Sequence, residues 1–285
     1  MTHARKQALL WLLSAIVADG FLATWGRAQS AYAEAVLADT PLAYWQLDSN
    51  NGTSLTGEYS STYLNGATTS AAGTGAPLAG SLDNAALALN GVNNSMPQYV
   101  TTGLSGGING AGSIVAWVNL AALPSTAGAY FYIAGESQVG NDFDLQFQND
   151  NRLYFYTGAG ENTSFTPDPT ALVNQWNQIV VTYDSTAGFR NIYWDGVLVS
   201  SVTSGGINSA SKTSAFTIGY SSVFGGRDFN GLIDDVSVFG SALNSTQVFQ
   251  LYAEAIPEPP VYVLLFLGSA GILLFLVKQR RSAAA

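Results

Sequence analysis

The sequence predicts an all-β fold, an antiparallel β-sandwich of about 220 residues that lies between two targeting segments. Apolar and polar residues alternate with a period of two in many short segments, which are rich in β-branched and aromatic side chains. Turns of Gly, Ser, Asn and Thr separate these segments. The pair Asp195-Gly196 is the strongest hairpin signal, because a two-residue type I′ turn needs positive φ at both positions.

The expected strands follow one another from Tyr44 onward. They are SIVAWVNL (113–120), DFDLQF (142–147), RLYFYT (152–157), NQIVVTYD (177–184), RNIYWDGVLVSSV (190–202) and GLIDDVSVFG (231–240). One short helix is expected over 244–255, capped by Asn244 or Ser245. Many strands at this spacing and a single late helix are typical of a sandwich, and the tryptophans inside the strand patterns belong to its core: Trp45, Trp117, Trp176 and Trp194.

Residues 1–33 have the organisation of a secretory signal peptide. Arg5 and Lys6 precede the apolar run ALLWLLSAIVA (8–18), and AYA (31–33) offers a small-x-small cleavage site. Cleavage after Ala28 is a second possibility, and a permanent N-terminal anchor is the alternative to removal. The short apolar run favours removal.

Residues 256–285 predict a single transmembrane helix. The run 261–277 contains 17 residues and no charge, and as a helix it spans roughly 26 Å, the short end of what crosses a bilayer. Basic residues from Lys278 to Arg281 follow at once, so the positive-inside rule keeps the last residues in the cytoplasm. Residues 34–255 are therefore expected as one domain on the other side of the membrane.

The composition excludes several classes of function. Between Glu34 and Ile256 there are 17 acidic and four basic side chains, a formal balance of −13, which excludes nucleic acid because phosphate binding needs Lys and Arg. The chain has no cysteine, and its one histidine, His3, lies in the segment expected to be removed. Disulfides, thiolate or histidine nucleophile systems and the usual zinc ligands are thus excluded, and any catalysis would have to use carboxylates.

Five motifs occur in the order seen in a known family. They are LADTPLAYWQLD, ALALNGVNNSMPQYV, GSIVAWVNL, WNQIVVTYDSTAGFRNIYWDGVLV and FNGLIDDVSVFGSALNSTQV. As a set, over about residues 36–253, they resemble laminin G-like, concanavalin A-like lectin/glucanase domains of bacterial surface proteins. The resemblance implies a jelly-roll sandwich of two antiparallel sheets, one of them concave.

The C-terminal segment resembles the PEP-CTERM sorting signal, with Pro257, Glu258 and Pro259, then a membrane helix and then basic residues. This resemblance implies recognition and cleavage by an exosortase in a Gram-negative bacterium that makes extracellular polysaccharide. The protein would be exported across the inner membrane, be anchored transiently in that membrane, and reach the cell surface or extracellular matrix. A stable single-pass anchor is the alternative.

Hydrolytic members of this fold carry alternate carboxylates on one face of a strand, so that nucleophile and acid flank the glycosidic bond. The nearest match is DFDLQF, which places Asp142, Asp144 and Gln146 on one face. Gln146 cannot donate a proton, and Asp142 has a shorter reach than Glu. An ordinary strand with its polar side in water is therefore favoured over catalysis, and we expect no enzyme activity.

A binding face has better support from the sequence. Alternation in RLYFYT places Arg152, Tyr154 and Tyr156 on one side of the strand. Pairing with DFDLQF through a hairpin around 149–151 would combine two polar faces. Aromatic rings beside Asp, Gln and Arg suit the C–H face and the hydroxyls of a sugar. The alternative is that both tyrosines pack partly into the sandwich with their hydroxyls in water.

One structural Ca²⁺ is a candidate cofactor. The resemblance implies Asp234 in GLIDDV as a ligand near the last strand, with Asp48 in YWQLD close by, and oxygen ligands suit this hard cation. Asp234 can equally be a buried structural carboxylate that accepts backbone N–H bonds.

The expected function is that of a secreted, exosortase-sorted surface or matrix protein. Its non-catalytic lectin-like module would bind or organise extracellular polysaccharide. A protein-binding adhesin or a structural surface protein is the alternative, and a large exposed apolar patch would favour the adhesin. A carboxylate-based glycosidase is the least favoured.

Overall fold

The computed structural model describes residues 30–256, except 51, 72–73, 79–84, 92–95, 107, 109, 139–142, 159–161 and 204–213. The expected signal-peptide core, the Pro257-Glu258-Pro259 motif and the expected membrane helix over 261–277 lie outside the described residues. Within the described part, no helix is long and apolar enough to cross a bilayer.

Two eight-stranded antiparallel sheets pack face to face. Sheet A has the order β14 (Val197–Thr203), β13 (Phe189–Trp194), β12 (Asn177–Asp184), β7 (Ala111–Leu120), β16 (Asn230–Phe239), β5 (Leu87–Asn90) and β4 (Thr68–Thr69), and β1 (Ala43–Trp45) also pairs with β16. Sheet B has the order β11 (Asn162–Phe165), β10 (Leu153–Tyr156), β9 (Phe143–Phe147), β8 (Phe131–Glu136), β15 (Ala215–Ile218), β6 (Tyr99–Ser105), β3 (Ser60–Leu64) and β2 (Gly52–Thr53). This confirms an all-β sandwich of two antiparallel sheets, consistent with a jelly roll.

The expected strands are confirmed with small changes at their ends. NQIVVTYD is β12, and RNIYWDGVLVSSV forms the β13–β14 hairpin, whose turn residues Asp195 and Gly196 have φ of 49° and 76°. The helix α4 (Ser245–Ala255) is capped by Asn244 in a capping box with Gln247. Period-two alternation and turn chemistry therefore located these elements correctly. The expectation of a single helix was wrong, since the described residues also form α2 (Ala31–Ala38), α3 (Pro124–Ala127) and the 3₁₀ turn η1 (Pro169–Ala171).

The main hydrophobic core lies between the two sheets. Each strand contributes alternate side chains, for example Ile114, Ala116 and Val118 of β7, which face Phe143, Leu145 and Phe147 of β9. Trp45 is buried here and stacks on Phe216, whereas Trp194 is only half-buried at the border of this core.

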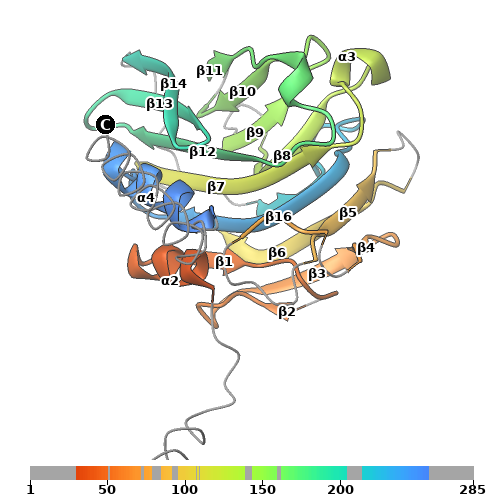
Figure 1. Ribbon diagram of the computed structural model, residues 1–285, viewed down its shortest axis with the longest axis horizontal. Helices are drawn as coiled ribbons and strands as arrows, with labels where there is room; N and C mark the ends of the chain where they lie inside the picture. The colour runs from red at the N-terminus through yellow and green to blue at the C-terminus, as the bar shows by residue number, and fades with distance from the viewer. Residues whose placement is uncertain are drawn as a thin grey trace, which may run out of the picture.

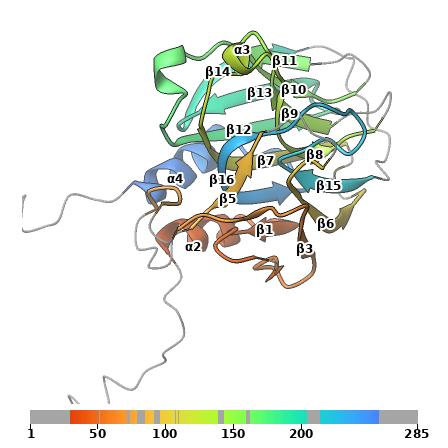
Figure 2. The same cartoon turned by 90° about the vertical axis from the view of Figure 1, so that its right-hand side faces the viewer.

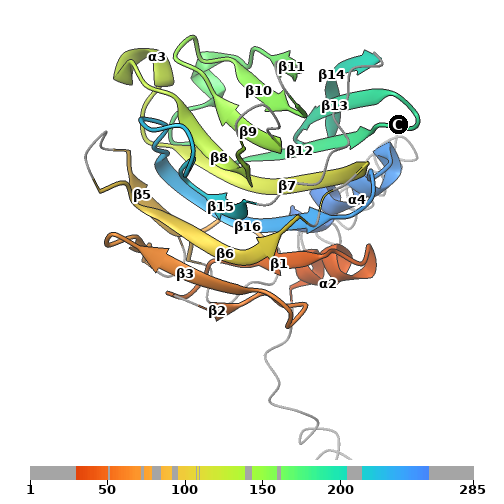
Figure 3. The same ribbon diagram turned by 180° about the vertical axis from the view of Figure 1, so that it is seen from behind.

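A second apolar cluster covers the outer face of sheet A. It lies under α2 (Ala31–Ala38) and α4, which come from opposite ends of the described chain and lie side by side (Figure 1). Turned by 90°, the molecule shows the two helices on one side, sheet A next to them and sheet B on the far side (Figure 2). The view from behind looks onto sheet B (Figure 3). The two faces of the sandwich are thus differently covered.

The helix α2 begins before the expected start of the domain at residue 34. Its cap is Ser30, whose Oγ accepts a hydrogen bond from the backbone N–H of Ala33 at 3.1 Å. Tyr32 and Ala33 are completely buried against sheet A and α4. Cleavage after AYA (31–33) would remove Tyr32 and Ala33 from this cluster.

Replacement of Gly231 tests the central strand β16. Gly231 has φ of +143°, and a Cβ at this position would overlap the carbonyl oxygen of Asn119 on the neighbouring β7. Gly231→Ala is expected to lower the free energy of unfolding by about 3 kcal/mol, measured by urea denaturation, because strain and overpacking add. The matched control is Gly225→Ala, since a Cβ at Gly225 meets no atom within 4 Å. Equal losses for the two variants would contradict the argument.

Candidate functional site

The strands β9 and β10 form the expected hairpin and bring the predicted polar residues together. Gln146 pairs with Tyr154, and Asp144 pairs with Tyr156. Their neighbours along each strand point into the core, so these four side chains lie on the outer face of sheet B. Asp142 lies outside the described residues.

Tyr154 and Tyr156 form an aromatic pair on this outer face. Their rings stack with centroids 5.8 Å apart and an interplanar angle of 16°, and both side chains are half-buried. The Tyr156 hydroxyl accepts a hydrogen bond from Nε2 of Gln148 at 2.6 Å, and the guanidinium of the exposed Arg152 lies 6.0 Å from the Tyr154 ring centre. The two rings are therefore stacked nearly parallel on the outer face, each partly in solvent and neither inside the sandwich.

Asp144 and Gln146 are not in water, which corrects the expectation of an ordinary strand with a solvated polar side. Their exposed fractions are 0% and 1%. Ser137 Oγ donates to Asp144 Oδ2 at 3.2 Å and accepts from Ser221 Oγ at 3.0 Å, while Arg227 Nη1 donates to Gln146 Oε1 at 3.0 Å. The segment 220–228 thus packs over the strand, where Arg227 bonds Gln146 directly and Ser221 bonds the serine that reaches Asp144.

Three residues that the sequence did not reveal complete the face. Arg227 lies 4.3 Å from the ring centre of Phe224 and 5.6 Å from that of Tyr130. The segment that carries Phe224 and Arg227 is far from the tyrosine hairpin in sequence. One signal could have pointed to it, because Arg227 is one of only four basic residues between Glu34 and Ile256.

We call this surface the tyrosine face. It consists of a buried polar floor, half-buried aromatic side chains and two guanidinium groups: Tyr130, Asp144, Gln146, Arg152, Tyr154, Tyr156, Phe224 and Arg227.

The electrostatics of the tyrosine face differ from those of the acidic chain as a whole. Burial, and next the nearby Asp144 carboxyl, raise the pKa of Tyr156, while Arg227 acts in the opposite direction. The phenol is therefore neutral at pH 7 and can both donate and accept hydrogen bonds. Of the other basic residues of the domain, Arg190 is buried and Lys212 lies outside the described residues. The described positive charge outside the core is thus concentrated on this face.

The suggested calcium ligands are not part of the tyrosine face. Asp234 is completely buried in β16, where Oδ2 accepts from Ala76 N at 2.8 Å and Oδ1 from Asp235 N at 3.1 Å. This is the arrangement of the structural-carboxylate alternative. Asp48 is half-buried, accepts from Ala85 N at 3.0 Å, and lines a small hollow of about 240 Å³.

A bulge places two adjacent carboxylates on one face of sheet A. The register of β16 against β7 shifts between Asp234 and Ser237, and Asp235 has a left-handed φ of 47°. Asp235 therefore lies on the same side as Asp234 and accepts a hydrogen bond from the Tyr44 hydroxyl. Burial first, and then neighbouring carboxyls that include Asp48, raise the pKa of both residues well above the usual range.

This cluster fits a cation only in part. Oxygen-rich, mutually repelling carboxylates suit a hard cation such as Ca²⁺. Among the described residues, however, no group of three or more Asp, Glu or His side chains is arranged to hold a metal ion. Main-chain carbonyl oxygens would have to supply the remaining ligands.

Asp144 and Asp228 are two of the described acidic groups in or beside the tyrosine face. Asp144 is enclosed by hydrogen-bonding partners, and Gln146 occupies the place of a second acid. Burial raises the pKa of Asp228, which pairs with Tyr220 through an isolated β-bridge, to about 6. A value of this kind suits a general acid, but hydrolysis also needs an accessible second carboxylate at glycosidase spacing.

The family of the chain is established by its sequence. Residues 93–249 match the profile of the "Concanavalin A-like lectin/glucanases superfamily". The chain belongs to this family, which confirms that part of the resemblance noted above. A comparison with curated proteins finds no match.

Solved structures of the same fold include sugar-binding and receptor-binding domains. Domain 4 of AbnA, a GH43 extracellular arabinanase from Geobacillus stearothermophilus solved with arabinotriose, is 18% identical with a TM-score of 0.54, and the match covers 74% of this chain and 98% of that one. The binding domain of botulinum neurotoxin serotype D is 14% identical, with a TM-score of 0.56 and coverages of 75% and 52%. The receptor-binding domain of botulinum neurotoxin type G is 18% identical, with a TM-score of 0.52 and coverages of 75% and 51%.

These likenesses show the fold alone, because the identities are low. The chain spans about half the length of the two toxin domains. The ligands of these proteins therefore do not transfer to this chain without further argument.

Proposed function

We propose that this protein is a secreted, exosortase-sorted surface or matrix protein whose lectin-like domain binds extracellular polysaccharide without cleaving it. The observation that carries the proposal is the tyrosine face. There, two stacked rings lie beside polar groups that are already fixed by hydrogen bonds.

The chemistry of the face matches that of a sugar. The rings of Tyr154 and Tyr156 offer flat apolar area to the C–H face of a pyranose or furanose ring. The Tyr156 hydroxyl and the guanidinium groups of Arg152 and Arg227 provide hydrogen bonds to hydroxyls, and the two cations can also pair with the carboxylate of an acidic sugar. Because internal hydrogen bonds already hold the floor in place, these side chains lose little conformational entropy when a ligand binds.

The polar floor supports the proposal that the site is non-catalytic. A glycosidase needs an accessible nucleophile or base and a proton donor that flank the glycosidic bond. Asp144 is enclosed, and Gln146 has no proton of suitable acidity. The AbnA domain, which was solved with arabinotriose, lends support by fold to the choice of a sugar as ligand.

A protein-binding adhesin is the second candidate. Val197 and Leu198 in the β13–β14 hairpin are 62% and 48% exposed, and this hairpin contacts α4, on which Phe249 is 59% exposed. Apolar side chains of this size in solvent favour a partner surface. A partner that binds here would leave the tyrosine face free, so variants separate the two candidates.

Export and sorting complete the proposal. The AYA site conflicts with the burial of Tyr32 and Ala33, so we place signal cleavage after Ala28, the second site that the sequence offers. The Pro257-Glu258-Pro259 motif would direct the exosortase, and the helix over 261–277 would hold the protein in the inner membrane until that cleavage.

Removal of the two aromatic rings tests the tyrosine face. Tyr154→Ala/Tyr156→Ala is expected to weaken binding of oligosaccharides at least about tenfold, because both stacking surfaces are lost. Binding is measured by calorimetry on the full-length chain in a detergent without a sugar headgroup, with arabinotriose and glucan, mannan and uronic acid oligomers as probes.

The matched control is Tyr154→Phe/Tyr156→Phe, which keeps both rings. It is expected to lose only the contribution of the hydroxyls, roughly threefold, and so to bind more tightly than the alanine pair. If the alanine pair binds as well as the wild type, with an unchanged melting temperature, the tyrosine face is not the sugar site.

Calcium is tested through stability. If Asp234 and main-chain oxygens hold Ca²⁺, its addition to chelator-treated protein is expected to stabilise the fold by about 2.7 kcal/mol at a hundredfold excess over Kd. Asp234→Asn should abolish this increase, whereas Asp150→Asn, at an exposed position, should leave it unchanged. Identical melting temperatures with Ca²⁺ and with chelator would assign Asp234 to the structural role only.

Processing is tested by mass spectrometry of both termini. Secreted material from wild-type cells is expected to begin at Gln29 and to lack the segment after Pro257-Glu258-Pro259, because an exosortase removes it. Cells without the exosortase should retain the intact C-terminal segment in their membranes. An intact tail in secreted wild-type material would exclude this route and favour the permanent anchor.

A further inference from the structure

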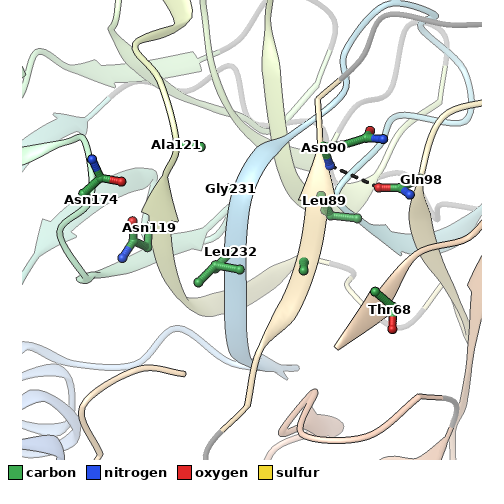
Figure 4. A pocket seen from close by; sticks show the side chains of 10 residues that line it. Thr68, Leu89, Asn90, Gln98, Asn119, Ala121, Asn174, Gly231 and Leu232 are labelled. Carbon is green, nitrogen blue, oxygen red and sulfur yellow. Dashed lines mark hydrogen bonds between the residues drawn. The ribbon is translucent and has the colours of Figure 1, made fainter. Parts of the chain in front are cut away.

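A second hollow lies on the outer face of sheet A, on the opposite side of the sandwich from the tyrosine face. It has a volume of about 450 Å³, which is within the range of about 300 to 1,000 Å³ typical of small-ligand sites. Figure 4 shows it from close by. None of the residues that line it is charged. We call it the amide groove, after the four carboxamide side chains at its border: Asn90, Gln98, Asn119 and Asn174.

The floor of the groove follows from the strand register. Thr68 of β4 pairs with Ala88 of β5, Ala88 pairs with Leu232 of β16, and Leu232 pairs with Asn119 of β7. These four residues therefore form one row across sheet A on its outer face. Leu232 is only half-buried. In the next row of the same face, Trp117 is buried within the cluster under the helices, so the groove begins where that cover ends.

The walls of the groove are carboxamides on two sides. Asn119 and Asn174 lie on one side of Leu232, and Asn90 and Gln98 lie on the other (Figure 4). Gln98 is fixed in place, since its Oε1 accepts from Asn90 N at 3.1 Å and its Nε2 donates to Gly66 O at 3.0 Å. One wall is therefore preorganised before any ligand arrives.

The other wall is held by its backbone. Asn174 has a left-handed φ of 56°, a conformation that Asn tolerates, and its N–H donates to Leu120 O at 2.9 Å. Val173 forms an isolated parallel bridge with the same residue of β7. Within the described part of the chain, the amide groups of Asn119 and Asn174 have no side-chain hydrogen bond, so both can serve a ligand.

We propose that the amide groove is a second binding site and that its ligand is an uncharged oligosaccharide. A carboxamide provides a donor and an acceptor together, which matches sugar hydroxyls, and Ala88 and Leu232 offer apolar contact to C–H groups. The groove has no cation to pair with a uronic acid, and the acidic balance of the domain repels anions. It therefore selects neutral sugars, whereas the tyrosine face can also accept acidic ones.

Two sites on opposite faces would allow one domain to bridge two polysaccharide chains. This consequence rests on the proposed function of the tyrosine face, but the groove itself does not. A bridging domain organises a matrix by multivalency, without any enzymatic step.

The experiment isolates the groove by removing the other site. The full-length Tyr154→Ala/Tyr156→Ala protein is titrated with neutral hexasaccharides (laminarihexaose, cellohexaose, mannohexaose and arabinohexaose) and with hexagalacturonate as the charged comparison. Residual binding of at least one neutral hexasaccharide, and none of hexagalacturonate, is expected. Adding Asn119→Ala should weaken that residual binding roughly three- to tenfold, because a hydrogen bond to the ligand is lost.

Controls distinguish loss of the ligand contact from loss of the fold. Asn149→Ala, at an exposed position outside the groove, should leave the residual binding unchanged, and melting temperatures verify folding. Leu232→Ala provides a second groove variant with the amides intact, and it should weaken binding through the floor. No residual neutral binding, or binding that neither groove variant alters, overturns the amide groove.

The two sites can fail separately. If every neutral probe is lost with the tyrosines, the groove proposal is wrong and the proposed function stands. If wild type and tyrosine variant bind alike while the groove variants do not, the groove stands and the tyrosine face is wrong.

Discussion

The pairing of β16 with its neighbours is the constraint on which the rest of the structure depends. This strand pairs with β7 on one side, and with β5 and β1 on the other. Its inward side chains, such as Ile233 and Val238, enter the core between the sheets. Because β16 comes near the end of the chain and β1 near its start, sheet A is complete only when distant parts of the chain have met. The helices α2 and α4, which also come from the two ends of the described chain, pack against each other in the same way.

Other segments of the chain partly cover both outer faces of the sandwich. The tyrosine face and the amide groove each lie beside such a segment. On sheet A the helices α2 and α4 cover Trp117, Ala76 and Tyr44 bond the two carboxylates of the bulge, and the amide groove begins beyond them. On sheet B the segment 220–228 buries Asp144 and Gln146, while the tyrosine pair on the adjacent strand stays half-exposed. An open sheet face would expose a broad surface, whereas a partly covered one leaves hollows with defined walls.

Strand positions and faces could be derived from the sequence because both are local properties. Alternation in DFDLQF and RLYFYT is sufficient to place Gln146 and Tyr154 on one face, and the hairpin turn makes the two strands neighbours. The burial of Asp144 could not be derived, because the serine and arginine that cover this face come from a segment more than 70 residues later. The same limit applies to the groove, whose row of four residues comes from four strands. The burial of Tyr32 could not be derived for a related reason, since a small-x-small pattern carries no information on tertiary packing.

Charge would give the two proposed sites different ligand classes, although they belong to one small domain. The formal balance of −13 between Glu34 and Ile256 disfavours an acidic polymer everywhere except where cations oppose the repulsion. Arg152 and Arg227 do so on the tyrosine face, within contact distance of its rings. At about 0.1 M salt, interactions beyond roughly 10 Å are largely screened, so these cations contribute little to a groove on the far side of the sandwich. A ligand in the proposed groove would therefore have to be recognised through hydroxyl and C–H contacts, and neutral sugars offer both.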